Sequence, residues 1–333
     1  MVCYRHETLM HSLNTLDSTT LASIPPSVLG VVGVVVIHYQ HPAVTQQCLD
    51  ALAEQQGVRI ALRLVDNSKD GDAPAFIASD NFHSFNRLRG DNHGFSHANN
   101  LGLADLRKDL ERTDFLGVLL LNNDAFMDPD SLYRLAQNLR SASPLDRTDQ
   151  AVSVMAGATL LHPNRSLQSA GTRWHLRKGY GLPLNLATTP PSALYTAGES
   201  LEVLDYPSGA ALMLNPMALQ ALDWSMDPTY FLYFEELDML CRLLEQGPVL
   251  VFPSTNATCV HLEGASAGSG HHHHDRSACS DYHFHRSKKL FYRKHFPSLL
   301  PRMGLLHLGV LSKRLLRMQW AKANAVWKGY FWS

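Results

Sequence analysis

The chain has 333 residues, of which 45% are hydrophobic and 18% charged, and its formal net charge is −1. This composition is that of a folded globular protein, and it excludes both an intrinsically disordered chain and a protein that coats nucleic acid. The cysteines are scattered without any C-x-x-C pair, so they predict neither a disulfide framework nor a structural zinc site, and a reducing cytoplasmic location suits them best.

An N-terminal extension, rich in Ser and Thr, is expected over residues 1–29. The apolar run at residues 28–37 is too short to cross a bilayer, which takes about 20 apolar residues. The polar segment before it is longer than the usual start of a signal peptide. We therefore interpret this run as a buried strand.

A strand, a helix and a second strand are predicted next. Residues 31–39 are rich in β-branched side chains, as expected for a parallel strand covered on both faces. Pro42 marks the start of a helix, apolar residues then recur at helical spacing, and Gly57 ends the segment. The apolar run at residues 60–65 supplies the second strand, so the order predicts a βαβ unit.

The alternation of helices and strands continues along the chain. Residues 96–110 have helix-forming composition, and residues 115–121 read as another buried strand. Asp128 and Pro129 give an N-cap and first-turn signal for a helix at residues 129–140. We expect one α/β domain over residues 30–285, with a mixed, mostly parallel sheet flanked by helices, and a helical C-terminal segment over residues 286–333.

Acidic residues follow two of the predicted strands. Asp66 comes directly after the strand that ends at residue 65, and Asp124 lies just beyond the strand that ends at residue 121. Open α/β sheets bind their ligands at the carboxyl ends of the strands. The two acidic loops are therefore expected to face one crevice.

Asp66-Asn67-Ser68 fits two interpretations. Asp, Asn and Ser are common turn residues, and alone the tripeptide is more often an ordinary turn. At the edge of a sheet, Asp66 is also placed to accept a hydrogen bond from the imide N–H of a pyrimidine base.

Small and amide residues open the helix predicted from residue 96. They are Asn92-His93-Gly94-Phe95, then Ala98-Asn99-Asn100 and Gly102. Such a stretch lets backbone N–H groups approach a phosphate or a sugar. An ordinary loop is the equal alternative.

Asn122-Asn123-Asp124 is the candidate metal loop, because it exposes one carboxylate after two amides at the end of an apolar strand. A diphosphate with Mg²⁺ or Mn²⁺ needs few protein carboxylates, since the phosphates supply other oxygen ligands. A turn capped by Asp124 is the structural alternative.

Three acids follow an aromatic run in residues 231–238. Asp238 lies four residues before Arg242, which places the two side chains on one helical face as a predicted ion pair. Side chains two residues apart diverge by roughly 200° on a helix, so Glu236 points elsewhere. Glu236 and Asp238 are thus the catalytic candidates, with Glu236 free to act as a base and Asp238 expected to be structural. A solvated acidic helix start is the alternative.

Histidines give weaker signals. His261 follows an apolar run at residues 249–252, and taken alone it reads as an ordinary core or surface residue. The run from His271 to His274 lies among Gly, Ser, Ala and Asp and resembles an inserted affinity tag, so it receives no role.

The tail from residue 297 onward alternates apolar residues with Lys and Arg. A basic amphipathic segment of this kind suits an anionic membrane surface, where a lipid-linked acceptor would be found. A helical cap that packs on the domain, with its bases in water, is the equal alternative. We therefore expect a cytoplasmic location, with possible peripheral contact at the inner face of the cytoplasmic membrane.

Taken in order, the motifs resemble glycosyltransferase family 2, and within it the bacterial branch that includes rhamnosyltransferases. The matches lie between about residues 31 and 295 of the sequence. They are Val35-Val36-Ile37-His38-Tyr39, Val65-Asp66-Asn67-Ser68, Asn92-His93-Gly94-Phe95 with Asn99-Asn100, Leu121-Asn122-Asn123-Asp124, Ser208-Gly209-Ala210-Ala211, Phe234-Glu235-Glu236-Leu237-Asp238 with Arg242, and His261-Leu262-Glu263-Gly264.

The resemblance implies a GT-A type nucleotide-diphospho-sugar transferase fold and an inverting transfer. The donor would be dTDP-rhamnose or a UDP-sugar, the acceptor a cell-surface glycan or lipid-linked saccharide, and nucleic acid would not be a partner. Asp124 and His261 would bind Mg²⁺ or Mn²⁺, and Glu236 would be the base. The residues expected to bind the nucleotide sugar are Tyr39, Asp66, Asn67, Asn92, Gly94, Asn99, Asn123 and Gly209.

The sequence departs from the family pattern at two positions. Asn122 replaces the first acid of the D-x-D metal motif, which weakens the expected metal affinity, and Glu236 stands where Asp is more frequent. A catalytically impaired nucleotide-sugar or carbohydrate-binding protein on the same fold is therefore an alternative. Nucleotidyl transfer is disfavoured, because no Gly-rich phosphate loop with a Lys lies between Val31 and Asp66.

Overall fold

The structure, a computed structural model, describes residues 28–75, 79–110, 115–142, 152–184, 193–196, 201–262 and 277–332. Residues 1–27 of the expected extension and the run from His271 to His274 lie outside the described residues.

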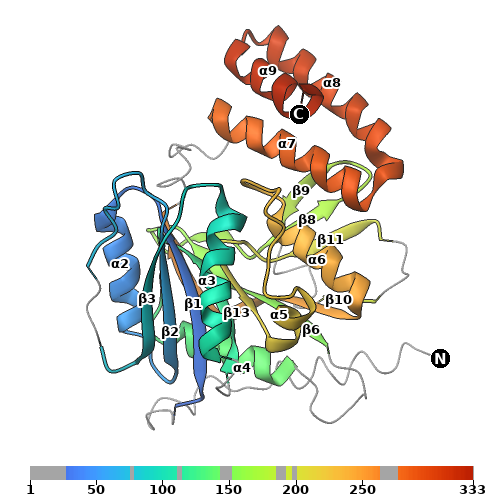
Figure 1. The fold of residues 1–333 in the computed structure, drawn as a ribbon. Coiled ribbons are helices and arrows are strands. Elements are labelled where there is room, and N and C mark those ends of the chain that lie inside the picture. The colour runs from blue at the N-terminus through green and yellow to red at the C-terminus, as the bar shows by residue number, and fades with distance from the viewer. Residues whose placement is uncertain are drawn as a thin grey trace, which may run out of the picture.

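A large mixed sheet forms the centre of the described chain, with the strand order β10-β13-β6-β12-β4-β1-β2-β3 (Figure 1). Its strands are β1 (Val31–His38), β2 (Arg59–Asp66), β3 (Phe82–Arg89), β4 (Phe115–Asn122), β6 (Ser153–Leu161), β10 (Ala193–Tyr195), β12 (Ala211–Leu214) and β13 (Val249–His261). β1 runs parallel to β2 and β4, β2 runs parallel to β3, and β13 runs parallel to β6. β12 is antiparallel to both of its neighbours. The predicted mixed, mostly parallel sheet is confirmed.

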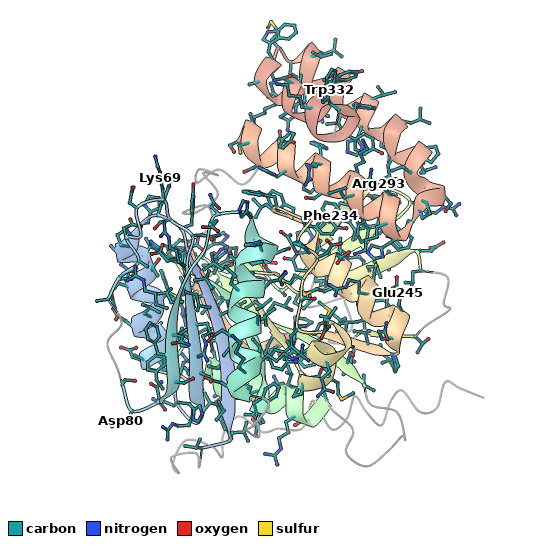
Figure 2. The ribbon with its side chains drawn as sticks, viewed as in Figure 1. Lys69, Asp80, Phe234, Glu245, Arg293 and Trp332 are labelled. Atoms are coloured by element: carbon teal, nitrogen blue, oxygen red, sulfur yellow. The ribbon has the colours of Figure 1, made fainter. Side chains whose placement is uncertain are left out.

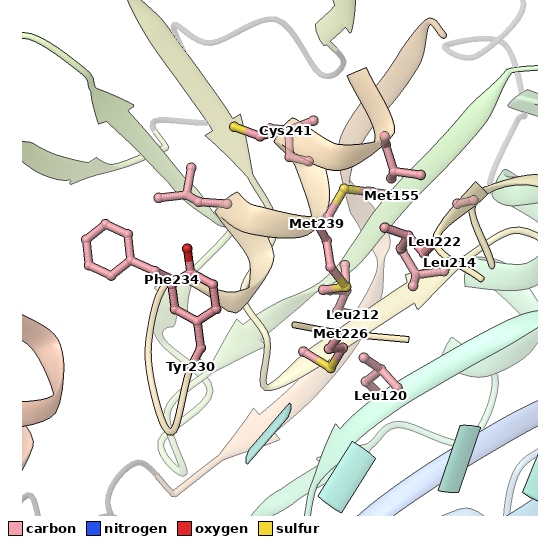
Figure 3. Packing of buried hydrophobic residues seen from close by; sticks show 14 of the residues in the cluster. Leu120, Met155, Leu212, Leu214, Leu222, Met226, Tyr230, Phe234, Met239 and Cys241 are labelled. Atoms are coloured by element: carbon pink, nitrogen blue, oxygen red, sulfur yellow. The ribbon is translucent and has the colours of Figure 1, made fainter. Parts of the chain in front are cut away.

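Helices cover both faces of this sheet. They are α2 (Pro42–Ala53), α3 (Phe95–Leu110), α4 (Ser131–Ala142), α5 (Pro216–Ala221) and α6 (Glu235–Gln246). α2 and α3 lie on opposite sides of the β1–β2–β3 region (Figure 1). Alternate side chains of β1 point to opposite faces, so Val35 packs in the cluster with α3, α5 and α6, whereas Val34 packs in the cluster with α2 and α4. Figure 3 shows Leu120, Leu212 and Met239 within the first cluster.

Two short strands extend the large sheet, and a second, smaller sheet stands beside it. β5 (Ala125–Met127) pairs with β13, and β7 (Leu167–Ser169) pairs with β6. The small antiparallel sheet has the order β11-β8-β9, built from β11 (Val203–Tyr206), β8 (Thr172–His175) and β9 (Tyr180–Pro183).

The predicted helical C-terminal segment is confirmed. It comprises α7 (Ala278–His295), a 3₁₀ turn (Pro297–Leu299), α8 (Leu300–Leu316), α9 (Trp320–Val326) and a final π-helical stretch (Trp327–Trp332). These helices stack next to β8 and β9 (Figure 1). The expected boundary between residues 285 and 286 falls inside α7, so one continuous helix joins the two parts.

The helix expected from residue 129 begins later than predicted. α4 starts at Ser131, and Asp128 is therefore not its N-cap. The carboxylate of Asp128 instead pairs with Arg165 at 2.8 Å and accepts a hydrogen bond from the hydroxyl of Thr258. The charge-assisted pair with a distant Arg outcompetes the local capping bond that the sequence pattern suggests.

Candidate active site

A cavity of about 780 Å³ opens beyond the carboxyl ends of β1 and β4. This volume is in the range of small-molecule sites. Residues from the loop before α6 and from the first turns of α7 close it on the other side, and Phe234 marks the place where these two parts meet (Figure 2). The expected site residues in its lining are Tyr39, Asn67, Asn92, Gly94, Asn123, Gly209, Glu236 and His261. The remaining expected residues, Asp66, Asn99, Asp124 and Asp238, are buried behind this lining.

The carboxylate of Asp66 is held from three directions. Ser68 Oγ donates to it at 2.6 Å, Arg87 Nη2 donates at 2.9 Å, and Arg89 Nη1 lies 3.3 Å away. Burial on its own favours the neutral acid, but the hydrogen bonds from Ser68 and Arg87 outweigh it and lower the pKa of Asp66. Asp66 is therefore an ionised group. It stabilises the turn that places Asn67 in the lining of the cavity.

Asn67 and Gly94 shape one wall of the cavity. Oδ1 of Asn67 accepts a hydrogen bond from the backbone N–H of Asn92 at 3.3 Å. Gly94 has a φ of +107°, and a Cβ there would lie 2.6 Å from the backbone of Phe231. Only glycine permits this approach, which brings the loop before α3 against the loop before α6. Asn99 lies deeper in α3, where its amide donates to the carbonyl of Phe95 at 3.1 Å.

Asp124 and His261 face each other across the pairing of β5 and β13, in which His261 is the partner of Ala125. Nε2 of His261 lies 3.3 Å from Oδ1 of Asp124. Oδ1 is buried, and among the described residues it has no hydrogen-bond partner. A buried carboxylate oxygen without a donor is costly unless a cation completes its environment.

Gln168, from β7, fixes the orientation of His261. Its Nε2 donates to the carbonyl of His261 at 3.0 Å, and this bond identifies which end of the amide is the donor. Its Oε1, an acceptor, therefore lies 2.8 Å from Nδ1 of His261, so Nδ1 carries the proton. With the proton on Nδ1 alone, the lone pair of Nε2 faces Asp124, and the two electron donors suit a shared metal ion.

A second group of possible metal ligands consists of His38, Asp66 and Asp72. It is a poorer cation site, because Arg87 and Arg89 already neutralise Asp66. His38 is also engaged, with Thr45 at 2.7 Å on one ring nitrogen and Asp72 at 3.0 Å on the other. The same Thr45 hydroxyl accepts from Asn123 at 2.8 Å.

Glu236 points into the cavity from the first turn of α6. Burial raises the pKa of its carboxyl, although the backbone N–H groups of Glu236 and Gly209 act in the opposite direction. Gly209 lies so close that a Cβ there would overlap Oε1 of Glu236. A carboxyl with a raised pKa that is exposed to a cavity is suited to proton transfer.

The ion pair predicted between Asp238 and Arg242 is present, but it is long. Arg242 Nη1 lies 3.8 Å from Oδ2 of Asp238, and the same guanidinium donates hydrogen bonds to the carbonyls of Ser225 and Leu222. Lys294 Nζ and His295 Nε2, both from α7, each lie 2.7 Å from Oδ1 of Asp238. These groups reach the carboxylate from an adjacent helix, which an (i, i+4) pattern does not reveal.

The loop before α6 carries unusual backbone geometry. Tyr233 and Phe234 have φ values of 72° and 73°, in the left-handed region that residues with a side chain rarely adopt. Phe234 is nevertheless fixed by its neighbours, because it packs against Trp174 and Phe291 with ring centroids 5.0 Å and 5.4 Å away. Strain of this kind persists where the surroundings determine the backbone, and it gathers at functional sites.

No model of a known protein family matches the chain. A curated relative is the low-salt glycan biosynthesis hexosyltransferase Agl10 of Haloferax volcanii, which is 22% identical over 189 residues. The match covers 54% of this chain and 52% of Agl10, so the chain spans about half the length of the curated relative it matches.

Solved structures of low sequence identity are similar in part. S. aureus TarS 1–349 in complex with UDP-GlcNAc is 12% identical, has a TM-score of 0.48, and the match covers 90% of this chain and 81% of that chain. GalNAc-T7 with UDP, GalNAc and Mn²⁺ is 11% identical, has a TM-score of 0.47, and the match covers 79% of this chain and 50% of that chain.

Proposed function

We propose that the chain is an inverting glycosyltransferase that moves a sugar from a nucleoside diphosphate sugar to a hydroxyl group. The observation that carries the proposal is the meeting of Glu236 and His261 in the lining of one cavity, with Asp124 directly behind His261. A proton acceptor and a candidate metal pair on the same cavity are what transfer from a diphosphate leaving group requires. The similarity to a hexosyltransferase of glycan biosynthesis supports this chemistry.

The wall formed by Asn67 and Asn92 is proposed to bind the nucleotide. Asn67 lines the cavity beside the ionised Asp66, and both follow β2 at the carboxyl edge of the sheet. Amide groups there can recognise the polar edge of a pyrimidine base. The proposed donors are UDP-sugars and dTDP-rhamnose.

Asp124 and His261 fit a divalent cation, because Oδ1 of Asp124 is orphaned and Gln168 directs the Nε2 lone pair of His261 toward it. When bound, Mg²⁺ or Mn²⁺ would neutralise charge that develops on the leaving diphosphate. Asp124 and His261 would supply two ligands, and phosphate and water oxygens would supply the others, as is usual for Mg²⁺.

Glu236 is proposed to remove the proton from the acceptor hydroxyl. The acceptor oxygen then attacks the anomeric carbon from the face opposite the diphosphate, the bond to the diphosphate breaks, and the configuration inverts. The backbone N–H of Gly209 holds the carboxylate toward the cavity. A cell-surface glycan or a lipid-linked saccharide is the proposed acceptor.

The decisive experiment is a thermal-shift screen with UDP- and dTDP-sugars, with and without Mn²⁺, followed by detection of released nucleoside diphosphate. Ligands that bind the native state raise the apparent melting temperature. We expect stabilisation by one nucleotide sugar and release of its diphosphate that a chelator stops. Stabilisation without any turnover, with or without saccharide acceptors, would favour the alternative of a binding protein, which the single acid in Asn122-Asn123-Asp124 keeps open.

A further inference from the structure

α8 has a buried face and, opposite it, an exposed apolar face. Met303 and His307 are buried against the other C-terminal helices. On the opposite side, the exposed fractions are 71% for Leu305, 45% for Leu308, 41% for Leu315 and 85% for Leu316. The spacing of these leucines places them on one stripe of the helix. A surface helix normally has one apolar stripe, which faces the protein core. The exposed stripe of leucines therefore indicates an interaction surface.

The apolar surface continues past the end of α8. Met318, in the turn between α8 and α9, is 74% exposed, and Trp320, the first residue of α9, is 65% exposed. We define the outer face as Leu305, Leu308, Leu315, Leu316, Met318 and Trp320. Trp is favoured at membrane–water interfaces because its ring is apolar while its N–H remains hydrated.

The charged residues in the sequence around the outer face are all basic. From Tyr282 to Ser333 the sequence contains eleven Lys and Arg residues and no Asp or Glu, although the chain as a whole has a net charge of −1. Lys313 and Arg317 are exposed next to the leucines. Apolar side chains bordered by bases complement a surface that is apolar inside and anionic at its edge.

We propose that the outer face docks in the plane of an anionic lipid bilayer. None of the described helices is long and apolar enough to cross a membrane, which agrees with contact along the surface. Basic amphipathic helices bind such surfaces by burying their apolar side chains at the headgroup boundary while their bases meet anionic lipids.

Docking through this face leaves the cavity uncovered. Ser280 and His283 of α7 line the cavity, and α7 packs against α8 and α9. Two helices, α8 itself and α7, each about 10 Å across, therefore lie between the outer face and the cavity. If the proposed transfer is correct, this arrangement holds the cavity near a lipid-linked acceptor, but the docking itself does not depend on that activity.

Flotation of the full chain with vesicles tests the proposal. Vesicles of phosphatidylcholine mixed with phosphatidylglycerol are compared with vesicles of phosphatidylcholine alone, at low and high salt. We expect binding to the anionic vesicles that weakens with salt. Leu305→Glu and Leu316→Glu should each lower the binding constant about tenfold, because each removes a buried leucine side chain. Lys313→Gln should lower it about fivefold.

Matched controls separate the outer face from general stickiness. Leu182→Glu and Leu194→Glu replace leucines that are 47% and 50% exposed outside the C-terminal helices, and both should bind vesicles as the unchanged chain does. Circular dichroism and melting curves confirm that each variant folds. The proposal would be overturned if the chain did not float with anionic vesicles, or if the control variants lost as much vesicle binding as Leu305→Glu and Leu316→Glu. It would also be overturned if the chain bound no vesicles but formed a dimer in analytical ultracentrifugation that Leu316→Glu dissociates. Thermal shifts induced by nucleotide sugars are measured without vesicles. They test the proposed function independently, so its failure can be distinguished from a failure of membrane docking.

Discussion

Oε1 of Gln168 lies 2.8 Å from Nδ1 of His261, and this contact determines which ring nitrogen faces Asp124. The contact joins β7, which carries Gln168, to β13, which carries His261. Without a partner for Nδ1 the imidazole ring of His261 could rotate, and neither its orientation nor its tautomer would be set. The proposed metal site therefore depends on a residue that is outside both predicted metal positions.

Gln168→Leu should weaken Mn²⁺ binding about 10- to 100-fold, since it removes the partner that orients the ring of His261. Electron paramagnetic resonance of free Mn²⁺ measures the affinity without reference to turnover. Gln168→Glu keeps an acceptor for Nδ1 and should bind Mn²⁺ better than Gln168→Leu. Gln47→Leu, on the exposed side of α2, is the control. Equal affinity in Gln168→Leu and the unchanged chain would contradict the assigned role.

Glu236→Gln should lower the turnover rate by about 10²- to 10⁴-fold, the usual contribution of a general base, while the donor-induced thermal shift is retained. Glu245→Gln, on the exposed end of the same helix, should leave both unchanged. Loss of donor binding together with turnover in Glu236→Gln would show that this residue supports the structure.

The pH dependence follows from the raised pKa of Glu236. The base acts when it is deprotonated, so kcat/KM should fall as the pH drops through this pKa, and the fall should begin at a higher pH than an ordinary glutamate gives. Pre-steady-state or steady-state rates across the pH range measure this acid limb. An acid limb at the ordinary glutamate value would argue against burial of the base.

Gly209→Ala should lower turnover about 100-fold, the effect of a displacement of about 1 Å in a reacting group. The added methyl group overlaps Oε1 of Glu236, and the flexible end of that side chain yields, so the melting temperature should change little. Gly247→Ala is the control, because nothing lies within 4 Å of a Cβ there. This prediction would be refuted if Gly209→Ala lowered the melting temperature strongly but left the turnover rate of the folded protein unchanged.

Asp238→Ala should destabilise the fold by about 3 kcal/mol, because it leaves Lys294 and the buried His295 without their common acceptor. Urea unfolding followed by circular dichroism gives the free energy of unfolding. Asp223→Asn removes the charge from an exposed pair with Arg107, keeps a residue that tolerates the φ of 49° at this position, and should have almost no effect. Similar losses in the two variants would mean that the contacts from α7 do not anchor α6.

The central strands and the edge of the sheet that carries the site could be predicted from the sequence. Residues 31–39, 60–65 and 115–121 are predominantly apolar runs, and such runs identify strands covered on both faces. Asp66 follows one of these runs directly and Asp124 lies just beyond another, so the rule for strand ends places them at one edge. β3 escaped prediction because it is an edge strand with the sequence Phe82-His83-Ser84-Phe85-Asn86-Arg87-Leu88-Arg89, in which no apolar run stands out.

Contacts between distant segments could not be predicted. Gln168 is one glutamine in a short strand, and its importance appears only when β7 lies beside the end of β13. The two closer partners of Asp238 were missed for the same reason, since Lys294 and His295 come from another helix. Local patterns report neighbours on one helix or strand, whereas these pairs are created by tertiary packing.

The pairing of Ala125 with His261 has a consequence for the order of events during synthesis. β1, β2 and β4 emerge from the ribosome long before β13, and N-terminal segments generally fold first. The wall that is proposed to bind the nucleotide can thus assemble while Asp124 still lacks its histidine. A nascent chain that ends before residue 261 would lack one of the two proposed metal ligands, so binding of a metal ion by the proposed pair would report completion of the sheet.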